Sequence, residues 1–180
     1  MKLSKEEIVF EVIKERRSVR AYKEQNVPKE MLTKILEAGR WAPTPSNVQS
    51  WRFIVIQESR QLKSLKALSP GFPRQAQVAI AVCSDQRDMQ IFEGPWPPIL
   101  AAEEAAVAVQ NMMLMAHSLS VGSCPVVSFS KVGIRELLKL PNYIYPIFLV
   151  TLGYSDDRPV PPPRKPLSQI TFWERYEEAI

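Results

Sequence analysis

The stretch ILAAEEAAVAVQNMMLMAHSL, residues 99–119, decides the fold class of this chain. Its apolar residues continue nearly all round a helix of that length, and a helix of this kind is buried inside a protein. Charged residues at 103–104 and amides at 110–111 interrupt the run, so a membrane span is not expected. We therefore predict one long central helix in the protein interior.

Segments with strand and helix patterns lie on both sides of this central helix. Strands are predicted at residues 51–56, 76–83, 124–129 and 145–154, and helices at residues 4–16, 28–41, 59–68 and 132–140. The second strand is apolar enough to be buried on both faces of a sheet. The mixture indicates an α+β or α/β protein in which helices cover a sheet.

The C-terminal part of the chain differs in composition from the rest. Residues 158–167, RPVPPPRKPL, are too rich in proline for a helix and should be extended. A short helix is predicted for FWERYEEAI at residues 172–180. The length of 180 residues suits one domain and no internal repeat is found, so we expect a single domain over 1–180 with an arm at about 156–180.

Composition excludes several kinds of site. The chain has 23 Lys and Arg against 19 Asp and Glu, and the net charge of +4 favours an anionic ligand more than nucleic acid. One histidine, His117, and two separated cysteines, Cys83 and Cys124, cannot build a His-rich or zinc site, so no metal is expected. The apolar surroundings of all three indicate buried reduced thiols and a structural histidine.

The remaining signals of composition concern location and nucleotide binding. The charged N-terminal stretch has no signal-peptide core, so a cytoplasmic protein is expected. The six glycines do not cluster into a phosphate-binding loop. Any nucleotide must therefore be held without a glycine-rich turn.

Residues 15–20, ERRSVR, place three arginines around one serine where the first helix should end. Arginine forks match the geometry of phosphate and stay charged at any useful pH, which indicates an anion site. The alternative is that the arginines only complement the helix dipole at its C-terminus, and the spacing alone favours this simpler explanation.

Three further segments are richer in functional groups than folding requires. The loop PTPSNVQSW, residues 43–51, gathers amides and hydroxyls that could recognise a planar heterocycle or could only bond their own backbone. GSCPVVS at 122–128 follows the central helix. The basic pair in PRKP at 163–166 is either part of a linker or a phosphate clamp from the far end of the chain.

The order of these motifs resembles the nitroreductase family of FMN-dependent oxidoreductases over nearly the whole chain. The motifs are RRSVRAY (16–22), WAP (41–43), S-N-x-Q-x-W (46–51), QN (110–111), GSCP (122–125) and PPPRKPL (161–167). The pairing of RRSVR with SNVQSW is the specific part. The resemblance implies an α+β fold with a mostly antiparallel central sheet, flanking helices and a long buried helix, assembled as a homodimer with flavin at the subunit interface.

The resemblance also implies a role for individual residues. The FMN phosphate would be held by Arg16, Arg17 and Ser18, together with Arg164 and Lys165 from the C-terminal arm. The flavin ring would meet Arg20, a loop of the second subunit, and the end of a strand under the isoalloxazine; the residues are Ser46, Asn47 and Gln49 in the loop, and Pro125, Val126, Val127 and Ser128 in the strand. No essential catalytic side chain is expected, and the flavin would be tuned by Arg20 and the Val127 backbone N–H.

The implied reaction takes electrons from NADH or NADPH, through FMN, to an organic acceptor such as a nitroaromatic or a quinone, in a ping-pong cycle. Three alternatives stay open. The chain could store FMN or regulate through it without turnover, it could use flavin for dehalogenation or flavin breakdown, or it could bind nucleic acid weakly without flavin.

The aromatic residues and two departures from the family pattern complete the expectations. Phe92 and Trp96 could line the acceptor pocket, although Trp96 could equally be simple packing. The tryptophans at 41, 51 and 173 should be core or dimer-interface residues. Ser50 stands where the family often has proline, which is expected to loosen the loop, and Pro45 stands where it often has Gly or Ser.

Overall fold

A four-stranded antiparallel sheet forms the centre of the computed structural model, which describes residues 3–176. The strands are β1 (Trp51–Ile56), β2 (Val78–Asp85), β3 (Gly122–Val126) and β4 (Ile144–Gly153), in the order β1-β2-β4-β3. The helices are α1 (Lys5–Glu15), α2 (Lys29–Arg40), α3 (Ser59–Ala67), α4 (Trp96–Ser118) and α5 (Lys131–Leu137). The predicted α+β class and antiparallel sheet are confirmed.

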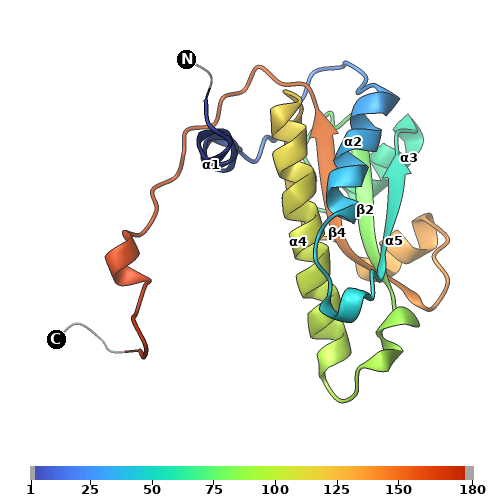
Figure 1. The fold of residues 1–180 in the computed structure, drawn as a ribbon. Coiled ribbons are helices and arrows are strands. Elements are labelled where there is room, and N and C mark those ends of the chain that lie inside the picture. Colours follow the sequence, from blue (N-terminus) through green and yellow to red (C-terminus); the bar gives the residue numbers. More distant parts are fainter. Residues whose placement is uncertain (1–2, 177–180) are drawn as a thin grey trace.

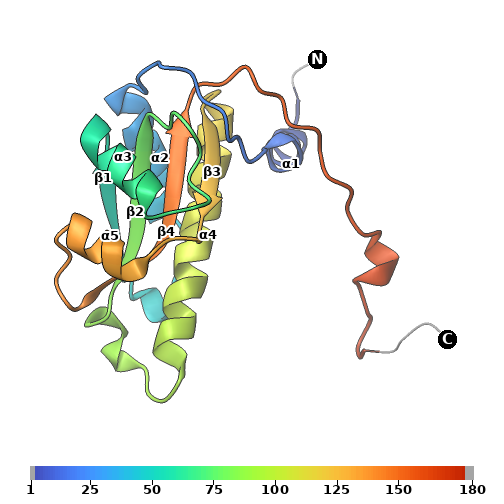
Figure 2. The same cartoon turned by 180° about the vertical axis from the view of Figure 1, so that it is seen from behind.

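Helices cover both faces of this sheet. Helices α2 and α4 lie on the face seen in Figure 1, and α3 and α5 lie on the face seen in Figure 2. Along β2, the side chains of Val78, Ile80 and Val82 enter the core under α2 and α4. Ala79 and its alternate neighbours along the strand enter the second core under α3 and α5. The prediction that this strand is buried on both faces is confirmed, and its burial makes β2 the centre of the molecule.

Helix α4 is the predicted central helix, and it buries one face rather than its whole circumference. It begins at Trp96, three residues earlier than predicted, because prolines are tolerated in a first turn whose N–H groups have no helical partner. Small and flexible residues such as Ala105, Met112 and Ala116 pack on the sheet. The opposite face stays open within residues 3–176, where Val107 is 39% exposed.

Helix α4 also has the length and composition of a membrane span, the one such helix within residues 3–176. Its buried face packs on the sheet and on α2, which identifies it as a core helix of this fold.

The two ends of the described chain leave the sheet together. Helix α1 begins with the predicted capping box, in which the Ser4 N–H donates to Glu7 Oε2 at 2.7 Å, and it buries none of its residues. Beyond Ser155 the chain runs outward past α1, as Figures 1 and 2 show, and residues 158–166 are extended as predicted.

The predicted C-terminal helix is wrong for residues 172–176, and residues 177–180 lie outside the described part. A single 3-10 turn, η3 (Leu167–Gln169), is the regular structure of the described arm. Most helical stability comes from packing an apolar face, and Trp173 is 83% exposed with no core beside it.

The predicted strand at 124–129 is shifted by two residues at its start and three at its end. β3 begins at Gly122, which pairs with Gly153 of β4. It ends at Val126 because the chain turns sharply there: the Phe129 N–H donates to the Val127 carbonyl at 3.1 Å. Ser130 then caps α5.

The three tryptophans expected in the core or the dimer interface divide between two environments. Trp51 is buried and stacks on Phe53, with ring centroids 6.2 Å apart, so a core position is confirmed for it. Trp41 and Trp173 are exposed, and a core position is wrong for both.

Candidate functional site

The segment from Arg16 to Tyr22 lies in extended conformation against the start of β3. Helix α1 ends at Glu15, Ser18 forms a parallel bridge with Ser123, and the Val19 N–H donates to the Ser123 carbonyl at 2.9 Å. The Tyr22 hydroxyl binds Thr151, with 3.0 Å between the two hydroxyl oxygens. The arginines of ERRSVR are therefore held on the sheet, just beyond the helix.

Two glycines allow this close approach. A Cβ at Gly153 would lie 2.8 Å from the Tyr22 ring, and a Cβ at Gly122 would lie 3.0 Å from Val19 Cγ1. Any side chain at either position would push the arginine segment away from the sheet.

Arg16 carries a half-buried positive charge that has no counter-charge among the described residues. Its Nε and Nη1 atoms are buried and find no hydrogen-bond partner among the described residues. Burial lowers the pKa of Arg16, and repulsion from Arg17 and from Arg164 of the arm lowers it further. A desolvated guanidinium stays charged, so the cluster favours an anion that would satisfy these donors.

The contacts of Arg17 agree with both explanations of the arginines, an anion site and an interaction with the end of helix α1. Its Nη1 atom donates to the Lys14 carbonyl at 2.6 Å, as expected of an arginine at the end of a helix. Its Nε atom is buried without a partner in the described chain, like that of Arg16. The helix end therefore accounts for part of Arg17 and for none of the buried nitrogens of Arg16.

The thiol of Cys124 lies under the same cluster. Burial raises the pKa of Cys124, and the positive charges of Arg20 and Arg16 oppose that rise. Both cysteines are free and buried, as predicted.

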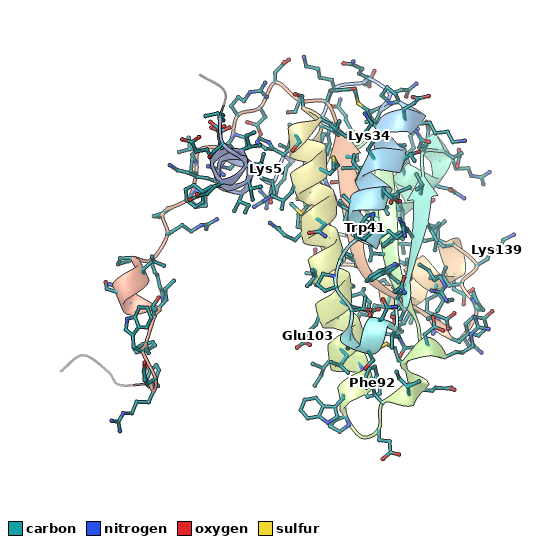
Figure 3. All side chains as sticks on the ribbon, in the orientation of Figure 1. Lys5, Lys34, Trp41, Phe92, Glu103 and Lys139 are labelled. Carbon is teal, nitrogen blue, oxygen red and sulfur yellow. The ribbon has the colours of Figure 1, made fainter. Side chains whose placement is uncertain are left out.

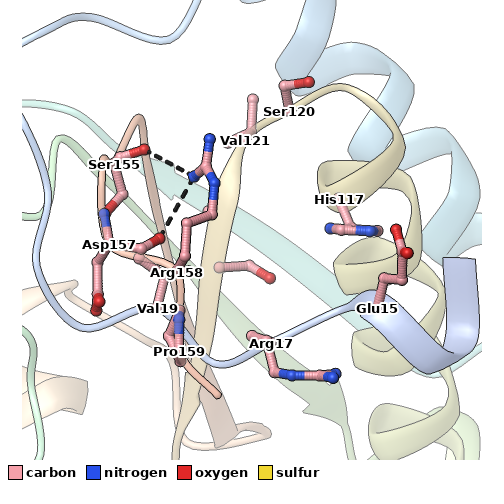
Figure 4. A pocket seen from close by; sticks show the side chains of 12 residues that line it. Glu15, Arg17, Val19, His117, Ser120, Val121, Ser155, Asp157, Arg158 and Pro159 are labelled. Carbon is pink, nitrogen blue, oxygen red and sulfur yellow. Dashed lines mark hydrogen bonds between the residues drawn. The ribbon is translucent and has the colours of Figure 1, made fainter. Parts of the chain in front are cut away.

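A hollow of about 400 Å³ lies beside the cluster, between the end of α1, the end of α4 and the start of the arm. Figure 4 shows Glu15 and His117 on one side of it and Arg158 on the other. Arg158 Nη1 donates to the Ser155 carbonyl at 3.2 Å. Arg17 lines this hollow and Arg16 does not. The hollow therefore lies next to the arginine cluster but does not include the unpartnered nitrogens of Arg16.

The amide loop before β1 is strained. Ser46, Asn47 and Gln49 have φ values of 50°, 56° and 54°, a left-handed conformation that residues other than glycine rarely adopt. The Gln49 amide donates to Asn47 Oδ1 at 3.1 Å, so the turn chemistry considered from the sequence is present. All three side chains remain exposed, and strain of this kind is concentrated at functional sites.

Buried polar groups that the sequence did not reveal hold the end of this loop. Ser50 is buried, its hydroxyl donates to Glu104 of α4, and its carbonyl accepts the Asp85 N–H at 2.8 Å. These contacts hold Ser50 where the family often has proline, and the expected loosening stays a prediction. The available signal was Glu104 itself, a carboxylate within a largely apolar helix.

The arginine cluster and the amide loop lie at opposite ends of the sheet. Ser123 is opposite Leu152, which pairs with Val78 at the start of β2, whereas Trp51 pairs with Ser84 near its end. Six residues of strand, about 20 Å, therefore separate Ser123 from Trp51 along the sheet. One chain therefore brings together Arg16, Arg17, Ser18, Arg20 and Arg164, with Lys165 beside Arg164 in the exposed arm, and it leaves Ser46, Asn47 and Gln49 apart from them.

The other predicted site residues lie in β3, directly after it, or in the connection before α4. Pro125 and Val126 lie in β3, and Val127 and Ser128 follow it. Val127 is exposed, and the Ser128 carbonyl accepts the Ser69 hydroxyl at 2.8 Å. Phe92, in the connection before α4, lies at the same end of the molecule as the amide loop (Figure 3).

Solved structures define the class of protein. The structure of NfrA1 from B. megaterium superposes with a TM-score of 0.88 and 24% identity, over 96% of this chain and 76% of that one, which establishes the shared fold. A nitroreductase family protein from Clostridium difficile superposes with a TM-score of 0.81 and 33% identity, over 92% of this chain and 98% of that one.

Sequence comparison gives the family. The model of the nitroreductase family matches residues 13–70 and 58–154. The FMN reductase [NAD(P)H] of Bacillus subtilis is 30% identical over 184 residues, which are 93% of this chain and 74% of that protein. A relative from Methanothermobacter thermautotrophicus, named for NADH dehydrogenase or NAD(P)H nitroreductase activity, is 33% identical over 158 residues, 84% of this chain and 79% of the relative. The chain belongs to the nitroreductase family and is an oxidoreductase of the NAD(P)H nitroreductase and FMN reductase type.

Proposed function

We propose that the protein is an FMN-dependent oxidoreductase that passes electrons from NADH or NADPH to an organic acceptor such as a nitroaromatic or a quinone. The observation that carries the proposal is the pair of buried Arg16 nitrogens without a partner in the described chain, beside Arg17 and Arg164. The phosphate of FMN carries close to two negative charges and offers several acceptor oxygens, so it would satisfy these donors and relieve the repulsion.

Each residue of the cluster would have its own role in binding FMN. Arg16, Arg17 and Ser18 would hold the phosphate, and Arg164 with Lys165 would close the arm over it. Arg20 would stabilise negative charge on the ring, and the Val127 backbone N–H would face the reactive nitrogen. When bound, the flavin would supply the redox chemistry, taking a hydride from the nicotinamide and passing two electrons to the acceptor in a ping-pong cycle.

We propose further that the site is completed by a second copy of the chain. The described chain exposes 12,028 Å², whereas a compact monomer of 20.5 kDa exposes about 8,800 Å². Exposed apolar residues lie on α1, on the outer face of α4 and on the arm. A homodimer would cover these surfaces and could bring the amide loop of one subunit, Ser46, Asn47 and Gln49, to the arginine cluster of the other.

The same proposal assigns the exposed aromatic residues. Trp41 and Trp173 would lie in the dimer interface, where large amphipathic rings are common. Phe92 and Trp96 would line the acceptor pocket near the amide loop. Residues 1–180 would form one cytoplasmic domain whose arm, at about 156–180, embraces the second subunit.

The first experiment is the visible spectrum of the purified protein, with heat release of any bound chromophore. Released FMN, and bleaching on addition of NADH or NADPH, would support the oxidoreductase. FMN that never bleaches would favour a storage or regulatory role, and a protein that takes up no FMN would contradict the proposal.

The variant R16Q tests the observation on which the proposal rests, the buried Arg16 nitrogens without a partner in the described chain. Losing the charge-assisted hydrogen bonds should weaken FMN binding by about 10- to 100-fold. R60Q, which removes an exposed arginine of α3, should leave the dissociation constant as in the wild type. Equal affinities for R16Q and R60Q would exclude Arg16 from the phosphate site.

A further inference from the structure

Glu104 is a buried acid that the proposed reaction does not use. It lies on the sheet-facing side of α4 and is only 2% exposed. Its Oε1 accepts the Ser50 hydroxyl, and its Oε2 is buried without a hydrogen-bond partner in the described part of the chain. No described Lys, Arg or His lies within ion-pair distance of it. A buried carboxylate with one bare oxygen and no cation is a costly place for a full negative charge.

The partner of Glu104 is the residue that ends the amide loop. The Ser50 hydroxyl lies 2.6 Å from the Ser84 hydroxyl, which accepts from the Gln86 amide at 3.2 Å. A short chain of hydrogen bonds thus runs from α4 through Ser50 to β2. Ser50 follows Gln49, the last of the three left-handed residues, so this contact fixes the strained loop at its end.

A second anchor acts on the same point from the other side. The Arg52 guanidinium donates to the Trp51 carbonyl at 3.0 Å and to the Gln49 carbonyl at 3.3 Å. The same group pairs with Asp85 at 3.2 Å and Asp88 at 2.7 Å. Because Arg52 is occupied by two aspartates, its charge is not free to neutralise Glu104.

We propose that Glu104 is a positioning residue for the amide loop: its carboxyl group holds Ser50, and through Ser50 it sets the geometry of Ser46, Asn47 and Gln49. The proposal rests on the proposed function in one respect, since it assigns those three residues to the flavin. The hydrogen-bond chain and the strain of the loop exist independently of that assignment.

Burial and the groups around Glu104 set the direction in which its pKa is shifted. Burial raises the pKa of Glu104, Asp88 of η2 (Asp88–Ile91) raises it further, and Ser50 and Arg52 of β1 oppose the rise. Asp85 of β2 is engaged by Arg87 at 2.6 Å as well as by Arg52. A raised pKa means that the folded protein keeps a proton which the unfolded chain releases. The stabilising contribution is therefore complete at acid pH and declines as the pH rises through the folded pKa.

The test compares E104Q, E104A and S50A, with E136Q as the control, because Glu136 is an exposed glutamate of α5. Infrared difference spectra recorded as the pH is raised should show the C=O band of a protonated carboxyl persisting to higher pH in the wild type than in E104Q. E136Q should behave as the wild type. The same loss of the band with pH in the wild type and in E104Q would contradict a raised pKa of Glu104.

The positioning role is tested by hydrogen exchange at residues 46–49 and by FMN affinity. E104A and S50A should raise amide exchange in the loop and weaken FMN binding about tenfold, since each removes a buried hydrogen bond. E104Q, a neutral isostere, should fall within about threefold of the wild type, and its stability should lose the decline with pH that Glu104 causes. Should E104A fail to fold, S50A leaves α4 intact and carries the same test.

Loop exchange unchanged in S50A, or as fast in E104Q as in S50A, would overturn the proposal. Loss of FMN binding in the wild type would instead contradict the proposed function, and the infrared and exchange results would still decide the role of Glu104.

Discussion

At the scale of single residues, burial acts on three ionisable groups in three different ways. Arg16 keeps its charge and lacks an anion within the described chain. Glu104 has one hydrogen bond and no ion-pair partner among the described residues, and burial raises its pKa. Cys83, in the second half of strand β2, packs in an apolar cluster, and burial raises its pKa to about 12.

The Cys83 thiol should make the protein sensitive to alkali. Its ordinary pKa is 9.0 and its folded pKa about 12, so between these values the unfolded chain releases a proton that the folded protein keeps. The unfolding free energy should therefore fall as the pH rises through this window, by up to about 1.4 kcal/mol per pH unit. Urea titrations of the wild type and C83A from pH 8 to 11 measure the difference, and parallel curves would contradict the assignment.

At the scale of elements, the arginine segment depends on two glycines in the strands below it. G153A would place a methyl group against the Tyr22 ring, which cannot retreat because its hydroxyl is bound to Thr151. We expect a loss of about 1–3 kcal/mol in unfolding free energy, together with weaker FMN binding because the segment that carries Arg16 is displaced.

The matched substitution is G39A, in α2. Its new methyl group would meet the end of the Met112 side chain, which is flexible and can move aside. Thermal or urea unfolding should therefore show a smaller loss for G39A than for G153A. A larger loss for G39A would show that the α2–α4 contact, and not the arginine segment, is the rigid part.

Sequence patterns predicted elements well wherever one physical effect dominated. The apolar run of β1 gave both of its ends, and the capping box gave the start of α1. The end of β3 depends on a turn at Val127 that the strand pattern did not predict. The helix predicted for residues 172–176 is wrong because the described residues offer it no surface to pack on.

The candidate site was likewise predicted from the sequence only in part. Resemblance selected the arginine segment and the amide loop as segments, but left-handed residues at 46, 47 and 49 are not glycines and cannot be read from composition. The link from Ser50 to Glu104 joins residues 54 positions apart, and only the fold brings them together.

At the scale of the whole molecule, the chain exposes more surface than a compact monomer of its mass, and large apolar residues contribute to that surface. Besides Val107 of α4, this surface includes Phe10 and Ile13 of α1 and Val160 and Trp173 of the arm. These residues belong to three elements that Figure 1 shows along one side of the molecule. The second subunit of the proposed dimer would cover this side.

The variant V107E should dissociate that dimer. A carboxylate buried without a partner in an apolar interface should raise the dissociation constant of the dimer by about 100-fold or more. V132E is the control, because Val132 is an exposed valine of α5 on the other face of the sheet. Sedimentation over a range of concentrations measures both variants, and a monomeric wild type would exclude the homodimer.

The docking of the arginine segment on β3 and of Tyr22 on β4 has a consequence for biosynthesis. Val19 bonds Ser123, and Tyr22 bonds Thr151, more than a hundred residues later in the chain. At about 5–20 residues per second, the ribosome needs roughly 7–25 seconds to deliver Thr151 after Tyr22 has been made. The arginine segment is therefore translated before the strands that hold it, and it cannot reach its native place until β4 has been made.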